Sequence, residues 1–159
     1  MKTRNIKLLM VIMAILLGGM PGIFANDATG QKAKATNRTV QDGLAKQKAA
    51  IAAAEKWLAL VDAGKYSASW TDAATYFKAA GSAAKWEQAL NDGRGSFGKL
   101  ISRKVKSAVY RTSLPGAPDG QYVVIQYDTA FENKKDAVET VTPMLDKDGQ
   151  WRVSGYYIK

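Results

Sequence analysis

The chain has 159 residues, with 23 Lys or Arg against 14 Asp or Glu, and it contains no His and no Cys. The lack of Cys excludes disulfides, thiolate nucleophiles, zinc fingers and thiolate-held iron–sulfur clusters. The lack of His removes the commonest general base and the commonest transition-metal ligand, so we expect no cofactor and no transition-metal site. An oxygen-only Ca²⁺ site remains compatible with the 14 acidic residues.

Residues 1–25 have the three-part pattern of a secretory signal peptide. A basic start precedes the apolar run Leu8–Leu17, and small Ala25 precedes the expected cleavage point. The alternative is a retained membrane anchor, but this run is about half of the roughly 20 residues that cross a bilayer. Export without Cys favours a bacterial periplasm, because small eukaryotic secreted domains usually carry disulfides. We therefore expect a periplasmic chain that starts at Asn26 and keeps no stable membrane anchor.

Residues 26–38 contain no apolar side chain larger than Ala and predict a flexible leader. The rest, residues 39–159, predicts a single domain. Thr39 with Asp42 resembles a capping box, and apolar residues follow at helical spacing as far as Gly64, a favourable helix end. Gly43 weakens the first turns of this first predicted helix.

Two further helices are expected before the sequence pattern changes from helical to strand-like. Ser67 or Ser69 is predicted to cap the second helix, which ends near Gly81. Ser82 is predicted to cap the third, which reaches Phe97 through a glycine-rich and therefore frayed or kinked stretch.

The second half of the chain alternates apolar and polar residues, as strands do. Strands are predicted near residues 103–111, 121–131, 137–145 and 151–159. Residues 133–136 predict a polar connection, and Asp148-Gly149 predicts a two-residue hairpin turn. Helices followed by hairpin-linked strands indicate an α+β domain, with the helices packed on one face of a four-stranded antiparallel sheet.

Several separated motifs carry a family resemblance. They are Ala54-Glu55-Lys56-Trp57-Leu58, Trp86, Arg94, Gly98, Arg103, the run Leu114–Tyr122, Phe131-Glu132-Asn133-Lys134, Glu139-Thr140-Val141 and the run Asp148–Tyr156. With them, residues 56–159 resemble domain of unknown function 4019, an uncharacterised family of exported bacterial proteins. The order of elements also looks like the nuclear transport factor 2-like (cystatin-like) superfamily, which implies a curved sheet and a cone-like shape. The resemblance implies no catalytic residues.

In such a cone the natural ligand site is the mouth between the helices and the concave face of the sheet. Six residues are candidates for a binding pocket there: Trp70, Tyr76, Arg94, Arg103, Tyr127 and Glu139. The aromatic members either line a cavity or fill it as core. The two arginines either hold an anionic ligand or form structural contacts with Glu139, Asp128 or helix carbonyls.

Two acidic residues, Glu139 and Asp128, lie within predicted strands. A buried carboxylate beside Tyr127 or Tyr110 would imitate the base and oxyanion donor of ketosteroid isomerase, a relative of the cone fold. The alternatives are a solvent-facing position or, for either carboxylate, an ion pair with Arg103. Lys104 and Lys106 add positive charge to the first predicted strand, and anionic lipid or cell-wall polymer is the class of partner that such charge would attract.

The favoured function is an exported, non-enzymatic module that binds a small ligand or an envelope protein through the mouth of the cone. The alternative is a cofactor-independent isomerase, dehydratase or hydrolase that uses a buried carboxylate and a Tyr. A third reading is a stabilising partner for another envelope protein, through an exposed sheet surface. Export argues against nucleic acid as a partner, and a homodimer is compatible with the sequence.

Overall fold

The computed structural model describes residues 29–159, and their side chains from residue 36 onward. The predicted signal peptide lies outside the described residues. The helices come first in the chain: α1 (Thr29–Asp62), α2 (Tyr66–Asp72), α3 (Thr75–Ala79), α4 (Ala83–Asp92) and the 3₁₀ helix η1 (Arg94–Phe97). The strands follow: β1 (Leu100–Arg111), β2 (Tyr122–Phe131), β3 (Lys134–Leu145) and β4 (Trp151–Ile158).

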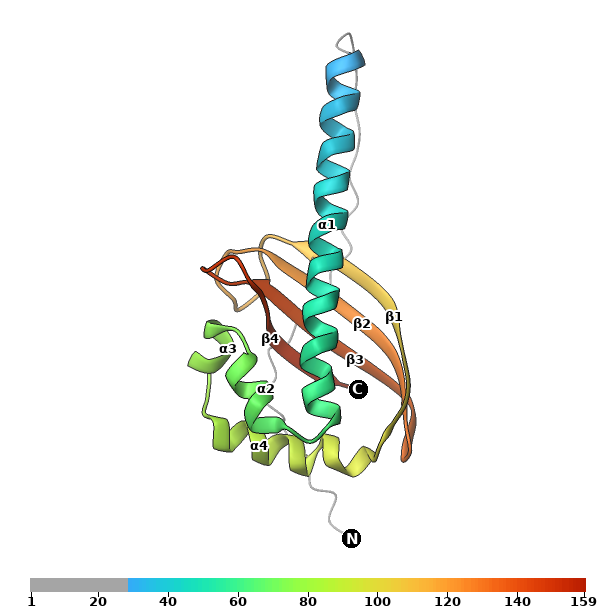
Figure 1. Ribbon diagram of the computed structural model, residues 1–159, viewed down its shortest axis with the longest axis vertical. Coiled ribbons are helices and arrows are strands. Elements are labelled where there is room, and N and C mark those ends of the chain that lie inside the picture. The colour runs from blue at the N-terminus through green and yellow to red at the C-terminus, as the bar shows by residue number, and fades with distance from the viewer. Residues whose placement is uncertain (1–28) are drawn as a thin grey trace.

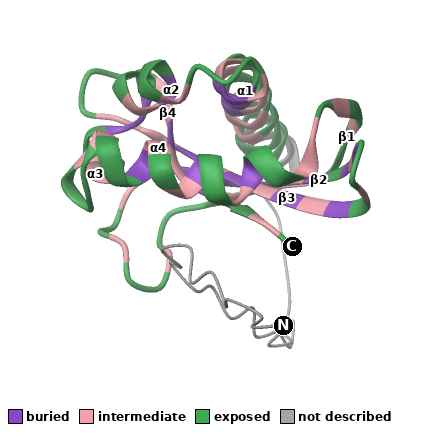
Figure 2. Ribbon diagram, turned by 90° about the horizontal axis from the view of Figure 1, so that it is seen from below, coloured by how far each residue is buried: buried purple, intermediate pink, exposed green. Residues whose placement is uncertain are grey.

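The four strands form one antiparallel sheet in the order β1-β2-β3-β4, and the helices pack against one of its faces (Figure 1). The buried residues lie mainly where α1 and α4 meet the sheet (Figure 2). The α+β class and the order of elements predicted from the sequence are confirmed.

Helix α1 is longer than the sequence predicts. It begins at Thr29 instead of Thr39, so residues 29–38 of the expected leader are helical here. The stretch contains no Pro and several good helix formers, and a helix already held by packing extends at little cost. The helix has 34 residues, and Figure 1 shows its N-terminal part projecting past the edge of the sheet. We call residues 29–45 the α1 overhang; its flexibility in solution stays a prediction.

Within the described residues, no helix combines the length and the apolar character that spanning a bilayer requires.

The predicted second helix is in fact two short helices, and its predicted caps are wrong. Helix α2 begins at Tyr66 after Lys65, which makes no side-chain cap. Ala73 and Ala74 then leave the helical conformation, because the Ala74 N–H donates to the Val153 carbonyl at 2.9 Å. This bond attaches the helices to the free edge of β4.

The predicted third helix begins as expected but ends early. The Lys85 N–H donates to the Ser82 hydroxyl at 3.4 Å, which confirms Ser82 as the cap of α4. The helix stops at Asp92, and Phe97 belongs to the separate turn η1. Gly93 and Gly98 bound that turn, and Gly98 has a φ of 75°, which favours glycine.

The strands are close to those predicted, with shorter connections. Strand β3 already begins at Lys134, inside the expected polar connection. The Asp146 N–H donates to the Gln150 carbonyl at 2.9 Å, so the β3–β4 loop has three residues, with Gly149 at a φ of 78°, rather than two. Each of the three ladders contains a register shift, and such irregularities bend strands.

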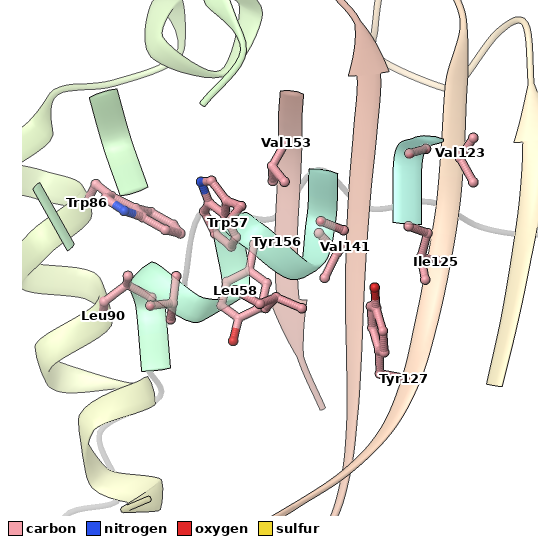
Figure 3. Close-up of a cluster of buried hydrophobic side chains, with 13 residues drawn as sticks. Trp57, Leu58, Trp86, Leu90, Val123, Ile125, Tyr127, Val141, Val153 and Tyr156 are labelled. Atoms are coloured by element: carbon pink, nitrogen blue, oxygen red, sulfur yellow. The ribbon is translucent and has the colours of Figure 1, made fainter. Parts of the chain in front are cut away.

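Ser69 connects Trp57 and Trp86 at the centre of the core through hydrogen bonds. It lies inside α2 and is fully buried. Its carbonyl accepts a hydrogen bond from Trp57 Nε1 at 2.8 Å, and its hydroxyl accepts one from Trp86 Nε1 at 3.0 Å. Both indole N–H groups are therefore satisfied on the helical side, while their rings face the sheet (Figure 3).

Candidate functional site

The space between the helices and the sheet, where a cone would open, is filled by aromatic rings. The Trp57 ring centre lies 5.2 Å from that of Tyr156 and 5.8 Å from that of Trp86. Phe77 meets Trp86 edge-on at 5.0 Å and approaches Trp70 at 5.5 Å. Trp70, a predicted pocket residue, is therefore part of a continuous aromatic cluster. This arrangement fits the alternative that the aromatic side chains fill the core.

Below this cluster, Arg103 lies between two carboxylates. From β1, its Nη1 donates to Asp62 Oδ2 at 2.6 Å and its Nη2 donates to Asp62 Oδ1 at 3.0 Å. On the other side its Nε donates to Glu139 Oε2 at 2.5 Å and its Nη2 also reaches Glu139 Oε1 at 3.2 Å. One guanidinium thus binds both carboxylates in paired fashion, which joins the end of α1 to β3.

Glu139 is fully buried and accepts hydrogen bonds from three side chains. Besides Arg103, the Thr129 hydroxyl donates to Oε2 at 2.7 Å and the Tyr156 hydroxyl donates to Oε1 at 2.6 Å. The alternation of strand residues explains the meeting: Arg103 is opposite Thr129 across β1 and β2, while Glu139 and Tyr156 lie close together across β3 and β4.

Arg94 completes the group from the other side of Asp62. Its Nη2 donates to Asp62 Oδ1 at 3.0 Å, and its Nη1 donates to the Gly98 carbonyl at 2.7 Å. Its guanidinium also stacks 4.1 Å above the centre of the Phe131 ring. We call Asp62, Arg94, Arg103 and Glu139 the buried charge network; its formal charges sum to zero.

The surroundings of Glu139 determine the protonation of two groups that bond to it, Arg103 and Tyr156. Burial alone lowers the pKa of Arg103, but its hydrogen bonds to Asp62 and Glu139 and their negative charge raise that pKa above the ordinary value. Burial, followed by the charge of Glu139, raises the pKa of Tyr156 well above the ordinary value. Both groups are therefore held in the protonated form in which they donate hydrogen bonds to Glu139.

Three of the six predicted pocket residues, Arg94, Arg103 and Glu139, come together in this network. Sequence reasoning missed Asp62, Thr129 and Tyr156. Asp62 carried a usable signal, because a carboxylate in the last turn of a helix opposes the helix dipole unless cations hold it.

The remaining candidates lie elsewhere. Tyr127 is adjacent to Glu139 across β2 and β3, but its buried hydroxyl has no hydrogen-bond partner among the residues that the structure describes. Tyr76 lies at one end of the sheet, where its hydroxyl donates to the Gly116 carbonyl at 2.9 Å. Asp128 is exposed and pairs with Lys106 at 2.9 Å, so it is no buried base.

None of the six candidate residues lines either of two surface hollows found among the described residues. One, of about 430 Å³, lies between α2, α3 and the β3–β4 loop. Its polar groups bond to one another: Asp146 Oδ2 accepts from both Thr75 N–H and Thr75 Oγ1 at 3.0 Å. The other, of about 580 Å³, is an open depression between α1 and α2.

No group of acidic residues among residues 29–159 is arranged to hold a metal ion.

Comparison with known proteins places the chain among uncharacterised relatives. A family model described as protein of unknown function (DUF4019) matches residues 53–156, which span α1 from the start of its packed half to Tyr156 in β4. No curated protein and no solved structure shows significant similarity to the chain.

Proposed function

The chain belongs to the DUF4019 family of proteins of unknown function, and we propose that it is an exported protein that acts by binding through its outer surface, without catalysis. One observation carries this proposal. Arg103 and Glu139 are bonded to each other and to their neighbours in the interior, whereas several large apolar side chains, such as Val40, Leu44 and Ile101, are exposed.

The catalytic alternative meets only half of its geometric requirement. Glu139 does lie 2.6 Å from a Tyr hydroxyl, that of Tyr156. However, both of its oxygens already accept bonds from Arg103, and neither surface hollow reaches it. A general base needs a free lone pair within reach of a substrate proton, so we assign Glu139 a structural role.

A thermal-shift screen tests binding through the surface against binding in the interior. We expect small metabolites to leave the melting temperature of the processed protein unchanged, while envelope macromolecules or lipids raise it. A metabolite that raised the melting temperature, and lost this effect in Trp70→Ala but not in Tyr157→Ala, would contradict the proposal and restore an interior pocket.

Export is supported by the basic start, the run Leu8–Leu17 and Ala25. Mass spectrometry of the protein recovered from the periplasmic fraction is expected to show a chain that starts at Asn26. Recovery of the intact chain from the cytoplasm would contradict export, while leaving the structural argument against catalysis in place.

We also infer that the sheet is curled as in the nuclear transport factor 2-like fold. The register shifts in all three ladders support this, because each one bends its strand. The aromatic and aliphatic core means that the curl encloses packed side chains at its centre.

A further inference from the structure

Strand β1 is an edge strand whose outer side pairs with no other strand in the described part of the chain. The opposite edge strand, β4, has part of its outer side bonded, because the Val153 carbonyl accepts the Ala74 N–H. Figure 1 shows β1 at the margin of the sheet, on the side away from α2 and α3. Since β1 has 12 residues, it offers a partner a long row of backbone donors and acceptors.

The inner face of β1 lacks a neighbour that a fifth strand would supply. Arg103 points to this face, where it bonds to Asp62 of α1, so strand alternation puts Val105 on the same face. Val105 lies opposite Tyr127 of β2. Tyr127 is 1% exposed and Val105 is 44% exposed, because β2 is flanked by a strand on each side and β1 by a strand on one side only. An apolar side chain on an added strand would cover Val105.

The outer face of β1 carries basic side chains. The strand contains four Lys or Arg and no acidic residue. Lys104 immediately precedes the inward-facing Val105 and therefore points outward. Arg111 also points outward, because its neighbour Tyr110 contacts Lys46 of α1 on the inner face.

These two outward cations have no carboxylate partner. Lys106 pairs with Asp128 at 2.9 Å, but neither Lys104 nor Arg111 forms an ion pair among the residues that the structure describes. Carboxylates on a neighbouring strand would come within contact distance of both cations, and opposite charges across two strands stabilise their pairing.

We propose that β1 binds an extended segment of another protein as a fifth strand, and that this segment alternates apolar with acidic residues. Its apolar side chains cover Val105 on the inner face, and its acidic side chains meet Lys104 and Arg111 on the outer face. Backbone hydrogen bonds to the open side of β1 hold the segment in place. This inference rests on the proposed function, binding through the outer surface, and adds the site and the chemistry of the partner.

The features that protect β1 against like strands leave this partner acceptable. Lysines on an edge strand repel a second copy of β1 but attract a segment that carries carboxylates. A register shift between Val105 and Ser107 divides the β1–β2 ladder into two regular runs. A partner therefore needs a matching irregularity at this point, which a flexible segment adopts more readily than the regular edge of a folded sheet.

Peptide binding, measured by fluorescence polarisation, tests the proposal. The probe is a labelled peptide, about as long as β1, in which Val alternates with Glu. Comparison peptides have Lys in place of Glu or Ser in place of Val. We expect the processed protein to bind the Val–Glu peptide and to bind both comparison peptides roughly tenfold more weakly. No binding of the Val–Glu peptide, or equal binding of all three, would overturn the proposal.

Two N-methylated forms of the Val–Glu peptide separate strand addition from attraction between charges. In an extended peptide, the N–H groups of alternate residues point to opposite edges. Methylation of all Val amides or of all Glu amides therefore removes the donors along one edge and spares the other. We expect one methylated peptide to bind and the other to fail. Equal behaviour of the two, whether both bind or both fail, would contradict strand addition.

A charge-reversed variant tests whether the site lies on β1. Lys104→Glu with Arg111→Glu is expected to weaken binding of the Val–Glu peptide roughly tenfold and to bind the Lys peptide instead. The control, Lys65→Glu with Lys85→Glu, makes the same change in net charge at exposed sites before α2 and in α4 and should keep the preference for the Val–Glu peptide. Circular dichroism checks that both variants fold. Equal effects of the two variants would rule out a site on β1.

Sedimentation velocity tests a second copy as the alternative occupant. We expect the processed protein to be monomeric, and a dimer that the Val–Glu peptide dissociates would assign the edge of β1 to a second copy and overturn the proposal. Failure of every peptide would leave the proposed function in place, because the thermal-shift screen detects binding at any part of the surface. An interior metabolite site would contradict the proposed function without abolishing peptide binding to β1.

Discussion

Tyr127 and Glu139 face each other across β2 and β3, yet only one of them is satisfied. Glu139 accepts hydrogen bonds from three side chains, whereas the buried Tyr127 hydroxyl has no hydrogen-bond partner within the described part of the chain. Burial, followed by the charge of Glu55, raises the pKa of Tyr127, so its hydroxyl stays neutral. Loss of the tyrosine hydroxyl should therefore have opposite effects at Tyr127, which has no bond to lose, and at Tyr156, which donates to Glu139.

Tyr127→Phe is expected to leave the free energy of unfolding unchanged or to raise it by up to about 1 kcal/mol, because it removes a buried group without a partner. Tyr156→Phe is expected to lower it by about 1.5–3 kcal/mol, because it removes a bond to a charged group. Urea unfolding of both variants measures the difference. A larger loss from Tyr127→Phe than from Tyr156→Phe would show that the Tyr127 hydroxyl has a partner in solution.

Breaking the buried charge network on one side is expected to be severe. Arg103→Met leaves Glu139 buried without its cation and should cost about 3–5 kcal/mol. The double change Arg103→Met with Glu139→Met leaves Asp62 paired with Arg94 at 3.0 Å and restores a charge balance of zero. In a double-mutant cycle, we therefore expect the double variant to be more stable than Arg103→Met alone. Additive losses would mean that the two residues are not coupled.

Gly98 is expected to tolerate no side chain. Its φ is 75°, and a Cβ there would lie 2.6 Å from Glu132 Oε2, the oxygen that accepts the Lys99 N–H. Gly98→Ala should therefore destabilise the protein by roughly 2 kcal/mol. Gly43 in α1 is the control, since a Cβ there meets nothing within 4 Å. Gly43→Ala should stabilise by about 0.5–1 kcal/mol in thermal or urea unfolding.

The β3–β4 loop is expected to respond to acid through Asp148. Its two hydrogen bonds to Arg152, both 2.7 Å, hold the pKa of this exposed carboxyl at about 2, against an ordinary value of 3.8. A carboxyl whose pKa is lowered by folding stabilises the native state above its unfolded pKa, and this contribution is lost as protonation proceeds. The stability difference between the parent and Asp148→Asn should therefore be constant above about pH 5 and shrink as the pH falls from about 4 towards 2. A difference that grew over this range would contradict the depressed pKa.

Local patterns predicted most of the fold. Alternation located all four strands, Ser82 marked the start of α4, and Gly149 marked the last hairpin. The break at Ala73 and Ala74 was not predictable in this way, because it depends on a bond to Val153, which is 79 residues further along the chain. The extension of α1 back to Thr29 does not follow from composition, because a polar stretch is compatible with both a leader and a helix and this one contains no Pro that would stop a helix.

The candidate site was predicted only in part, for a similar reason. The sequence left the orientation of Glu139 open, and the alternative that it pairs with Arg103 describes what the structure shows. Their second partner, Asp62, comes from the end of a helix whose position over the sheet depends on packing. Whether a cavity is lined or filled depends on how the rings of Trp57, Trp86 and Tyr156 fit together, and no spacing in the sequence specifies that.

The hydrogen bond between Ala74 and Val153 makes the two edge strands of the sheet, β1 and β4, differ in what covers them. On the outer margin of β4 the Val153 carbonyl is bonded to the helical segment, whereas β1 is the edge strand at the other margin. We therefore expect misassembly by strand exchange or fibril growth to start more readily on the β1 side, where closely spaced lysine charges would repel an identical neighbour. If the chain is exported unfolded, as proposed above, such protection against aggregation would act while it folds in its new compartment.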